Sequence, residues 1–158
     1  MKFITATLLD ELATRAKVAP RRRTHHNLHE VPEDPVQRLF IAAEPDSYFR
    51  PHRHRDKAEL AVVVRGVLDL LTFDENGRVV TRSIIGPEQQ IIGFETPAGA
   101  FHTLVAKAAG SVFFEVKRGP YDPQTAAEFA PWSPAEGTPE AAEFFRRLCN
   151  ARVGELIA

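Results

Sequence analysis

Residues 51–66 read PHRHRDKAELAVVVRG and carry the strongest indication of the fold in this sequence. It places His52 and His54 two residues apart, and Glu59 begins an apolar run that Gly66 ends. Side chains two apart on a strand point to the same face of a sheet, so the two imidazoles project together. The stretch therefore predicts two strands joined by a turn, with both imidazoles and one carboxylate directed at a common point.

A second stretch, PAGAFH at residues 97–102, supplies a third imidazole. Pro97 and Gly99 mark a turn, and His102 follows at the start of an expected strand. Any single histidine is more often a surface or hydrogen-bonded residue than a ligand, but three of the six histidines fall in these two stretches. Imidazole nitrogens and carboxylate oxygens bind borderline divalent ions at about 2.0 to 2.2 Å. We therefore predict one metal centre made by His52, His54, Glu59 and His102.

The metal expected at this centre is one divalent ion. A mixed nitrogen and oxygen donor set without thiolate suits Fe, Mn, Ni, Co or Zn, and the donor set does not identify which of them is bound. Four protein donors leave room for water or substrate in an octahedral shell, and open positions of this kind are what make a metal site catalytic.

The surrounding sequence predicts an all-β body. Short runs of Val, Ile, Leu, Phe and Thr alternate with turn residues, of which Asp-Glu-Asn-Gly at residues 74–77 is the clearest hairpin signal. No helical pattern lies between these runs, which favours a sandwich or barrel over a βαβ sheet. The expected strands are residues 36–41, 60–64, 67–73, 79–85, 90–94, 101–105 and 112–117.

Helices are expected at the two ends of a single domain spanning residues 1–158, with a β core at about 36–118. Residues 7–17 carry apolar side chains at helical spacing, with Thr7 as a capping signal. Residues 139–150 follow Thr138 and begin with a proline, a common way to start a helix. Between the first helix and the strands, residues 21–35 show no period, so we expect an irregular segment there.

Composition excludes several classes of function. The chain has 20 Lys and Arg against 21 Asp and Glu, so its net charge of −1 gives no general attraction to nucleic acid or to a membrane surface. No apolar run approaches the roughly 18 residues that a membrane helix needs, and acidic residues at 10 and 11 interrupt the only run resembling a signal peptide. A single cysteine, Cys149, fits a reducing compartment. We expect a cytoplasmic protein with a small-molecule partner.

The two stretches resemble the two motifs of the cupin superfamily. The first motif is matched by the spacing His-x-His, four residues, Glu, six residues, Gly within residues 52–66, and the second by Pro-x-Gly-x-x-His at residues 97–102. This resemblance implies an all-β fold of the cupin type, an antiparallel β-barrel or jelly roll with short N- and C-terminal helices. It also implies that the four predicted donors are metal ligands inside that body.

Most of residues 20–135 is similar to the WbuC family of cupin-fold metalloproteins. That likeness is carried by residues 36–38, 47–48, 51–54 and 114–121 and by Asn27 and His29. Members of the family are often associated with bacterial surface-polysaccharide gene clusters, but the family has no settled reaction. The likeness thus implies a bacterial metalloprotein connected with polysaccharide biosynthesis, without naming a substrate.

Four further residues are candidates for a pocket beside the metal. Asn27 and His29 precede the first expected strand, with a surface position as the alternative. Gln37 shares strand parity with inward apolar residues, although it could equally be a buried glutamine bonded to backbone. Tyr48 offers a phenol to a ligand, or packs with its hydroxyl at a rim.

Glu115 and Lys117 alternate with Val116 near the end of the last expected strand. We expect them to form an exposed pair, with a place in the pocket as the less favoured alternative.

Two functions from different classes fit this sequence. The first is a small-molecule enzyme whose metal acts as a Lewis acid on a sugar or carboxylate metabolite, with oxygen activation if the ion is iron. The alternative is a non-catalytic sugar-binding or sensing module with a structural metal, and a third reading is ligand binding without metal. Cupins commonly pair, and apolar faces on the terminal helices fit a homodimer.

Overall fold

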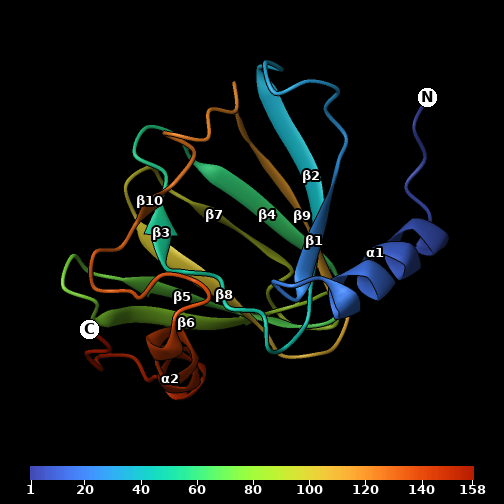
Figure 1. Ribbon diagram of the computed structural model, residues 1–158. Helices are drawn as coiled ribbons and strands as arrows, with labels where there is room; N and C mark the ends of the chain where they lie inside the picture. The colour runs from blue at the N-terminus through green and yellow to red at the C-terminus, as the bar shows by residue number, and fades with distance from the viewer.

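The computed structural model describes residues 1–158 as two antiparallel sheets flanked by two helices (Figure 1). The strands are β1 Arg23–Asn27, β2 Val36–Ala43, β3 His52–Arg53, β4 Glu59–Arg65, β5 Leu68–Phe73, β6 Val79–Ile85, β7 Gly93–Thr96, β8 Phe101–Ala106, β9 Ser111–Arg118 and β10 Glu128–Phe129. One sheet has the order β1-β2-β9-β4-β7 and the other β10-β3-β8-β5-β6. The predicted all-β jelly roll with short terminal helices is confirmed.

The two sheets face each other across a shared apolar core. Leu68 and Leu70 of β5 pack there against Phe113 of β9, from the opposite sheet. Because side chains alternate along a strand, Leu71 and Phe73 point to the other face of β5 and join a second core. β5 is therefore buried on both faces, which explains its almost continuous apolar sequence.

Helix α1, Ala6–Val18, covers the outer face of the first sheet. Leu12 and Ala16 are fully buried there, on the side of β2 and β9 that faces away from the shared core. The helix extends the expected 7–17 by one residue at each end. Its cap is Thr5 rather than Thr7, because the Thr5 hydroxyl accepts the hydrogen bond from the Leu8 amide at 3.1 Å.

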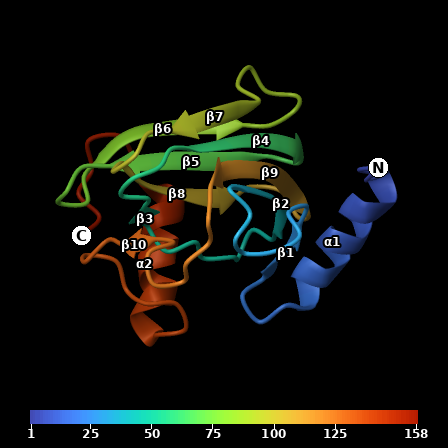
Figure 2. The same ribbon diagram turned by 90° about the horizontal axis from the view of Figure 1, so that it is seen from above.

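Helix α2, Pro139–Asn150, occupies the residues expected for it and covers the outer face of the second sheet. Phe144 and Leu148 pack against Leu71 and Phe101 in the second core. Figure 2 shows the two helices on separate sides of the molecule, with α1 beside β1 and β2. Neither helix combines the length and the apolar character needed to cross a lipid bilayer.

Strand β1 corrects the expectation of an irregular segment at residues 21–35. It pairs antiparallel with β2 along its whole length, with His25 opposite Ile41. The sequence of β1 is polar at every position, since it forms the edge of its sheet and one of its faces borders an open hollow. Polarity on both faces removes the alternation by which strands are recognised.

The expected strand at 90–94 is also displaced. β7 begins at Gly93, because the chain from Gly86 to Ile92 forms a turn in which the Gly86 amide donates to the Ile91 carbonyl. β3 is shorter than a complete strand and consists of His52 and Arg53 alone. It nevertheless pairs with β8 on one side and β10 on the other, which fixes the orientation of its backbone.

Candidate metal centre and adjoining hollow

Both sheets contribute to the centre predicted from the sequence. His52 of β3 is paired in register with His102 of β8, and His54 follows two residues after His52. Glu59 is the first residue of β4, in the opposite sheet. His102 is two residues from Leu104 of the shared core and therefore faces the same side of β8. Its ring thus points into the space between the sheets.

The structure brings all four predicted donors together. One ring nitrogen of each of the three histidines lies within 4.8 Å of the other two. The Nε2 atom of His54 is 2.7 Å from Oε2 of Glu59, and the Nε2 atom of His102 is 3.7 Å from Oε1 of the same carboxylate. His54, Glu59 and His102 are each less than 5% exposed, whereas His52 is half-buried.

Backbone carbonyls fix the tautomer of all three imidazoles. In each ring Nδ1 contacts a carbonyl oxygen, which can only accept a hydrogen bond, so Nδ1 must carry the hydrogen. The acceptors for His52, His54 and His102 are the carbonyls of Arg50, Ala126 and Ala100, at 3.0, 2.6 and 3.0 Å. In the neutral rings Nε2 is then an unprotonated acceptor, and the three Nε2 lone pairs are free to bind a cation.

These donors fit a divalent ion. The Nε2 atom of His102 is buried and has no hydrogen-bond partner, and Nε2 of His54 faces a carboxylate oxygen that also only accepts. Buried acceptors without a donor are costly, and a shared cation removes that cost. Metal-bound histidines characteristically donate their other N–H to a carbonyl or carboxylate, as all three rings do here.

The ionisation states at the centre suit cation binding. Burial, and then the proximity of His102, lowers the pKa of His52 to about 3, so this ring is neutral near pH 7. Burial opposes ionisation of Glu59, whereas the ammonium of Lys117, whose Nζ lies 3.0 Å from Oε2, favours the carboxylate. The pKa of Glu59 consequently lies well below its usual range, and the group is a carboxylate.

Lys117 and Glu115 are part of the centre's surroundings, and the expectation that they form an exposed pair is wrong. Lys117 Nζ lies 3.0 Å from Oε2 of Glu59 and 2.5 Å from Oε1 of Glu115, and Glu115 is buried. The reason is topological: β9 lies between β2 and β4, and Lys117 is opposite Glu59 in the register. Burial, and then the charge of Glu59, raises the pKa of Glu115. The sequence did hold one indication of this burial: Glu115 and Lys117 lie two and four residues after Phe113, so all three face the same side of the strand.

A hollow of about 480 Å³ adjoins the centre at Lys117. Asn27, His29 and Gln37 line it, so three of the four sequence-predicted pocket residues lie together there. Tyr48 does not, because its hydroxyl donates to the Pro134 carbonyl at 3.1 Å and its ring packs on the aromatic residues of α2.

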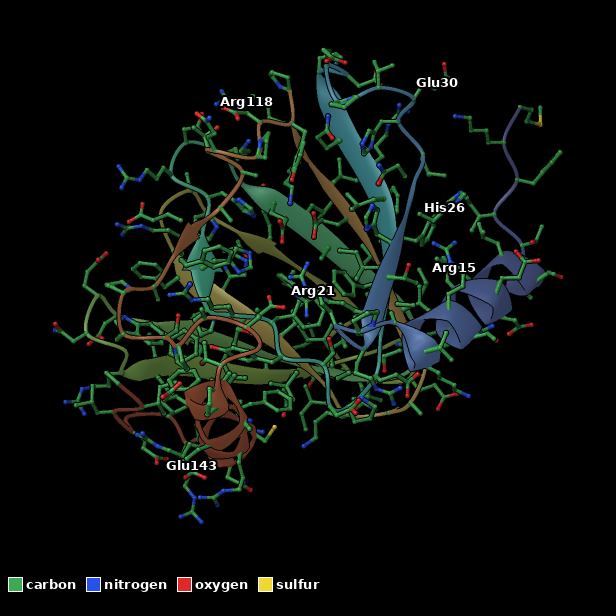
Figure 3. The ribbon with its side chains drawn as sticks, viewed as in Figure 1. Arg15, Arg21, His26, Glu30, Arg118 and Glu143 are labelled. Carbon is green, nitrogen blue, oxygen red and sulfur yellow. The ribbon has the colours of Figure 1, made fainter.

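Arginines at the other end of this hollow were not foreseen as pocket residues. Arg21 and Arg23 both line it, and both pair with Glu136 from the segment before α2. Figure 3 shows Arg21 near the middle of the view, between β3 and β1. The hollow therefore has a lysine next to the metal donors and two arginines elsewhere on its wall.

Comparison with known proteins places the chain in a family without an assigned activity. A family model described as "Domain of unknown function (DUF6016)" matches residues 4–85. No curated protein matches the chain.

Solved structures with the same fold belong to several different proteins. KdgF from Halomonas sp. is similar with a TM-score of 0.51 and 17% identity over 68% of this chain and 86% of that one. The capsular polysaccharide assembling protein CapF from Staphylococcus aureus has a TM-score of 0.58 and 16% identity, over 71% of this chain and 30% of that one. A mutant of Bacillus subtilis oxalate decarboxylase OxdC has a TM-score of 0.53 and 19% identity, over 82% of this chain and 33% of that one.

This chain thus spans about a third of the length of CapF and of OxdC. At such identities the likeness shows the fold alone, and the fold is that of the cupins.

Proposed function

The chain belongs to the family described as a domain of unknown function (DUF6016), and we propose that it is a divalent-metal-dependent enzyme acting on a small molecule. One observation carries this proposal: three buried or half-buried Nε2 lone pairs and a carboxylate converge without a hydrogen to share. His52, His54, Glu59 and His102 would hold the ion, which is Fe, Mn, Ni, Co or Zn.

A bound ion would act as a Lewis acid. It would polarise a carbonyl of a substrate or be chelated by two neighbouring oxygens of it. The protein's own residues prepare the site. Carbonyl contacts at Nδ1 keep each imidazole turned toward the centre, and Lys117 holds one oxygen of Glu59 in place. The hollow beside Lys117 gives a substrate room close to the donors, because Lys117 lines it and also contacts Glu59.

The proposal includes the family, compartment, oligomeric state and substrate class expected from the sequence. We infer a WbuC-like bacterial protein of the cytoplasm, forming a single domain and a homodimer, with a sugar or carboxylate metabolite as substrate in polysaccharide biosynthesis. The motif residues at 51–54 and 114–121 support the WbuC likeness, and the net charge of −1 supports a small molecule rather than nucleic acid as partner.

A non-catalytic binding or sensing module with a structural metal is the second candidate. The observation in its favour is the burial of His54, Glu59 and His102, each less than 5% exposed. A structural ion has all its positions filled by protein, whereas a catalytic ion keeps a position for water or substrate.

Metal content tests the proposal first. Untagged protein should contain about one divalent ion per chain by elemental analysis, and His102→Gln should lose it while retaining its circular dichroism spectrum. His26→Gln is the matched control, because His26 lies beside α1, away from the centre (Figure 3). Equal metal content in all three proteins would refute the site.

Water access then separates the two candidates. With Mn(II) bound, an enzyme with an open position should enhance the proton relaxation rate of solvent water through exchange at the ion. A closed structural site should give only the small enhancement of an ion that no water reaches, and that result would favour the binding module.

A further inference from the structure

We propose that the hollow beside Lys117 binds an organic anion, with its acid group held between Lys117 and β1 and its carbon skeleton on the apolar wall. This assignment rests on the proposed function, since the anion would be the substrate of the adjoining centre. It names the chemical class that the centre receives.

The walls of the hollow have two different characters. Leu39 and Ile41 of β2, with Phe49, present apolar surface suited to a carbon skeleton. The positions paired with Ile41 and Leu39 belong to β1: His25 and Asn27 are two residues apart, face the same side and so lie beside the apolar surface. A volume of about 480 Å³ falls in the usual range for small-ligand sites, about 300 to 1,000 Å³.

Hydrogen-bond donors on this wall are left without acceptors. The Lys117 ammonium has three N–H groups, of which Glu59 and Glu115 take two, and its side chain is 17% exposed at the hollow. His25 and Asn27 are exposed, and their side chains make no hydrogen bond within the chain. Lys117, His25 and Asn27 thus offer donors from two strands to an acceptor-rich group in this hollow.

The charge balance of the hollow points the same way. Arg21 and Arg23 share the single carboxylate of Glu136, which leaves one positive charge in excess. With a divalent ion bound, Lys117 and the ion would exceed the two carboxylates of Glu59 and Glu115 by one further positive charge. Glu30 at the rim is paired with Lys2 at 3.3 Å. A neutral ligand would not interact with this excess positive charge, whereas a carboxylate or phosphate ester would neutralise it.

Calorimetric titration with three compounds of one carbon skeleton tests the assignment. Glucose, glucuronate and glucose 6-phosphate differ in charge and acid group, so metal-loaded protein should bind at least one of the anions tenfold or more tightly than glucose. The tighter of the two anions identifies carboxylate or phosphate as the preferred group. Glucose binding as tightly as the anions, or no binding of any of the three at millimolar concentration, would overturn the assignment.

Substitutions on β1 make the test specific to the wall. The double variant His25→Ala with Asn27→Ala should weaken anion binding at least tenfold at unchanged metal content. The matched control is His26→Ala with Asn76→Ala, because neither residue lines the hollow. Unaltered affinity in the His25 and Asn27 variant would refute the role of β1.

The two proposals can fail separately. Anion binding that depends on β1 in a protein without a stoichiometric metal would retain the anion site and refute the metal-dependent enzyme. A stoichiometric metal in a protein that does not distinguish glucose from its anions would do the reverse.

Discussion

The Nε2 atom of His54 lies 2.7 Å from Oε2 of Glu59, and neither atom has a hydrogen to donate while the ring is neutral. The ring's only hydrogen is on Nδ1, where the Ala126 carbonyl accepts it at 2.6 Å. Without a cation, this contact requires an additional proton on the imidazole. The same contact is favourable as it stands when a metal lies among the Nε2 atoms and the carboxylate.

Metal binding should therefore stabilise the folded protein. An ion at one hundred times its dissociation constant adds about 2.7 kcal/mol to the free energy of unfolding. For a chain of this size that corresponds to an increase in Tm of about 5 to 10 °C. We expect this increase when Co(II) is added to chelator-treated wild type in a thermal melt, and no increase for His102→Gln. An equal increase in the two proteins would assign the ion to another place.

Removal of Lys117 should be costly because two buried carboxylates depend on it. Lys117→Met leaves Glu59 and Glu115 facing each other without their shared cation, and breaking a buried ion pair by removing one partner typically costs about 3 to 5 kcal/mol. Denaturant unfolding should show a loss of this order. Adding Glu115→Gln should restore most of it, because one carboxylate is then neutral. A double variant as unstable as Lys117→Met would contradict this account of the network.

Glu136 should make stability depend on pH. Burial raises its pKa, but hydrogen bonds from Arg21 and Arg23 outweigh burial, so the pKa of Glu136 lies below its usual value. A depressed pKa in the folded state means that the stabilisation is complete above the unfolded-state pKa and is lost as pH falls through the folded-state pKa. Glu136→Gln should therefore reduce the free energy of unfolding by about 1 to 2 kcal/mol at pH 7.

The same variant should approach wild type in the acidic range, where Glu136 is protonated in both states. Denaturant unfolding of the two proteins at pH 7, 5 and 3 measures the difference. A difference that does not shrink with acidification would exclude the carboxylate charge as its source.

The second core should hold α2 on the outer face of its sheet. Leu148 is fully buried beside Leu71, so Leu148→Ala should cost about 2 to 5 kcal/mol in the free energy of unfolding. Val80→Ala is the control, because Val80 is 53% exposed and should change the free energy of unfolding by less than 1 kcal/mol in order-of-magnitude terms. Similar losses in the two variants would contradict the burial of Leu148.

Much of the fold could be predicted from local patterns. Apolar runs separated by turn residues located most of the strands, because each strand buries at least one face. β1 escaped this reasoning, since its five residues are all polar and its place is decided by pairing with β2 and by the hollow it borders. An edge strand whose side chains face solvent or an open hollow carries little alternation of its own.

The candidate centre divides in the same manner. Histidines two residues apart, a carboxylate at a strand start and a histidine after a turn could be recognised because the spacing itself carries the geometry. Lys117 could not, since its contact with Glu59 depends on β9 lying next to β4, which is a property of strand order. The carbonyl that fixes the tautomer of His54 likewise comes from Ala126, far along the chain, whereas those for His52 and His102 lie only two residues before each ring.

The most direct measurement is X-ray absorption at the edge of the metal bound to purified protein. Coordination by His52, His54, Glu59 and His102 predicts a first shell of nitrogen and oxygen at about 2.0 to 2.2 Å. It also predicts outer-shell scattering from three imidazoles. A first shell containing sulfur, or a wild-type spectrum without imidazole scattering, would contradict the four-residue centre.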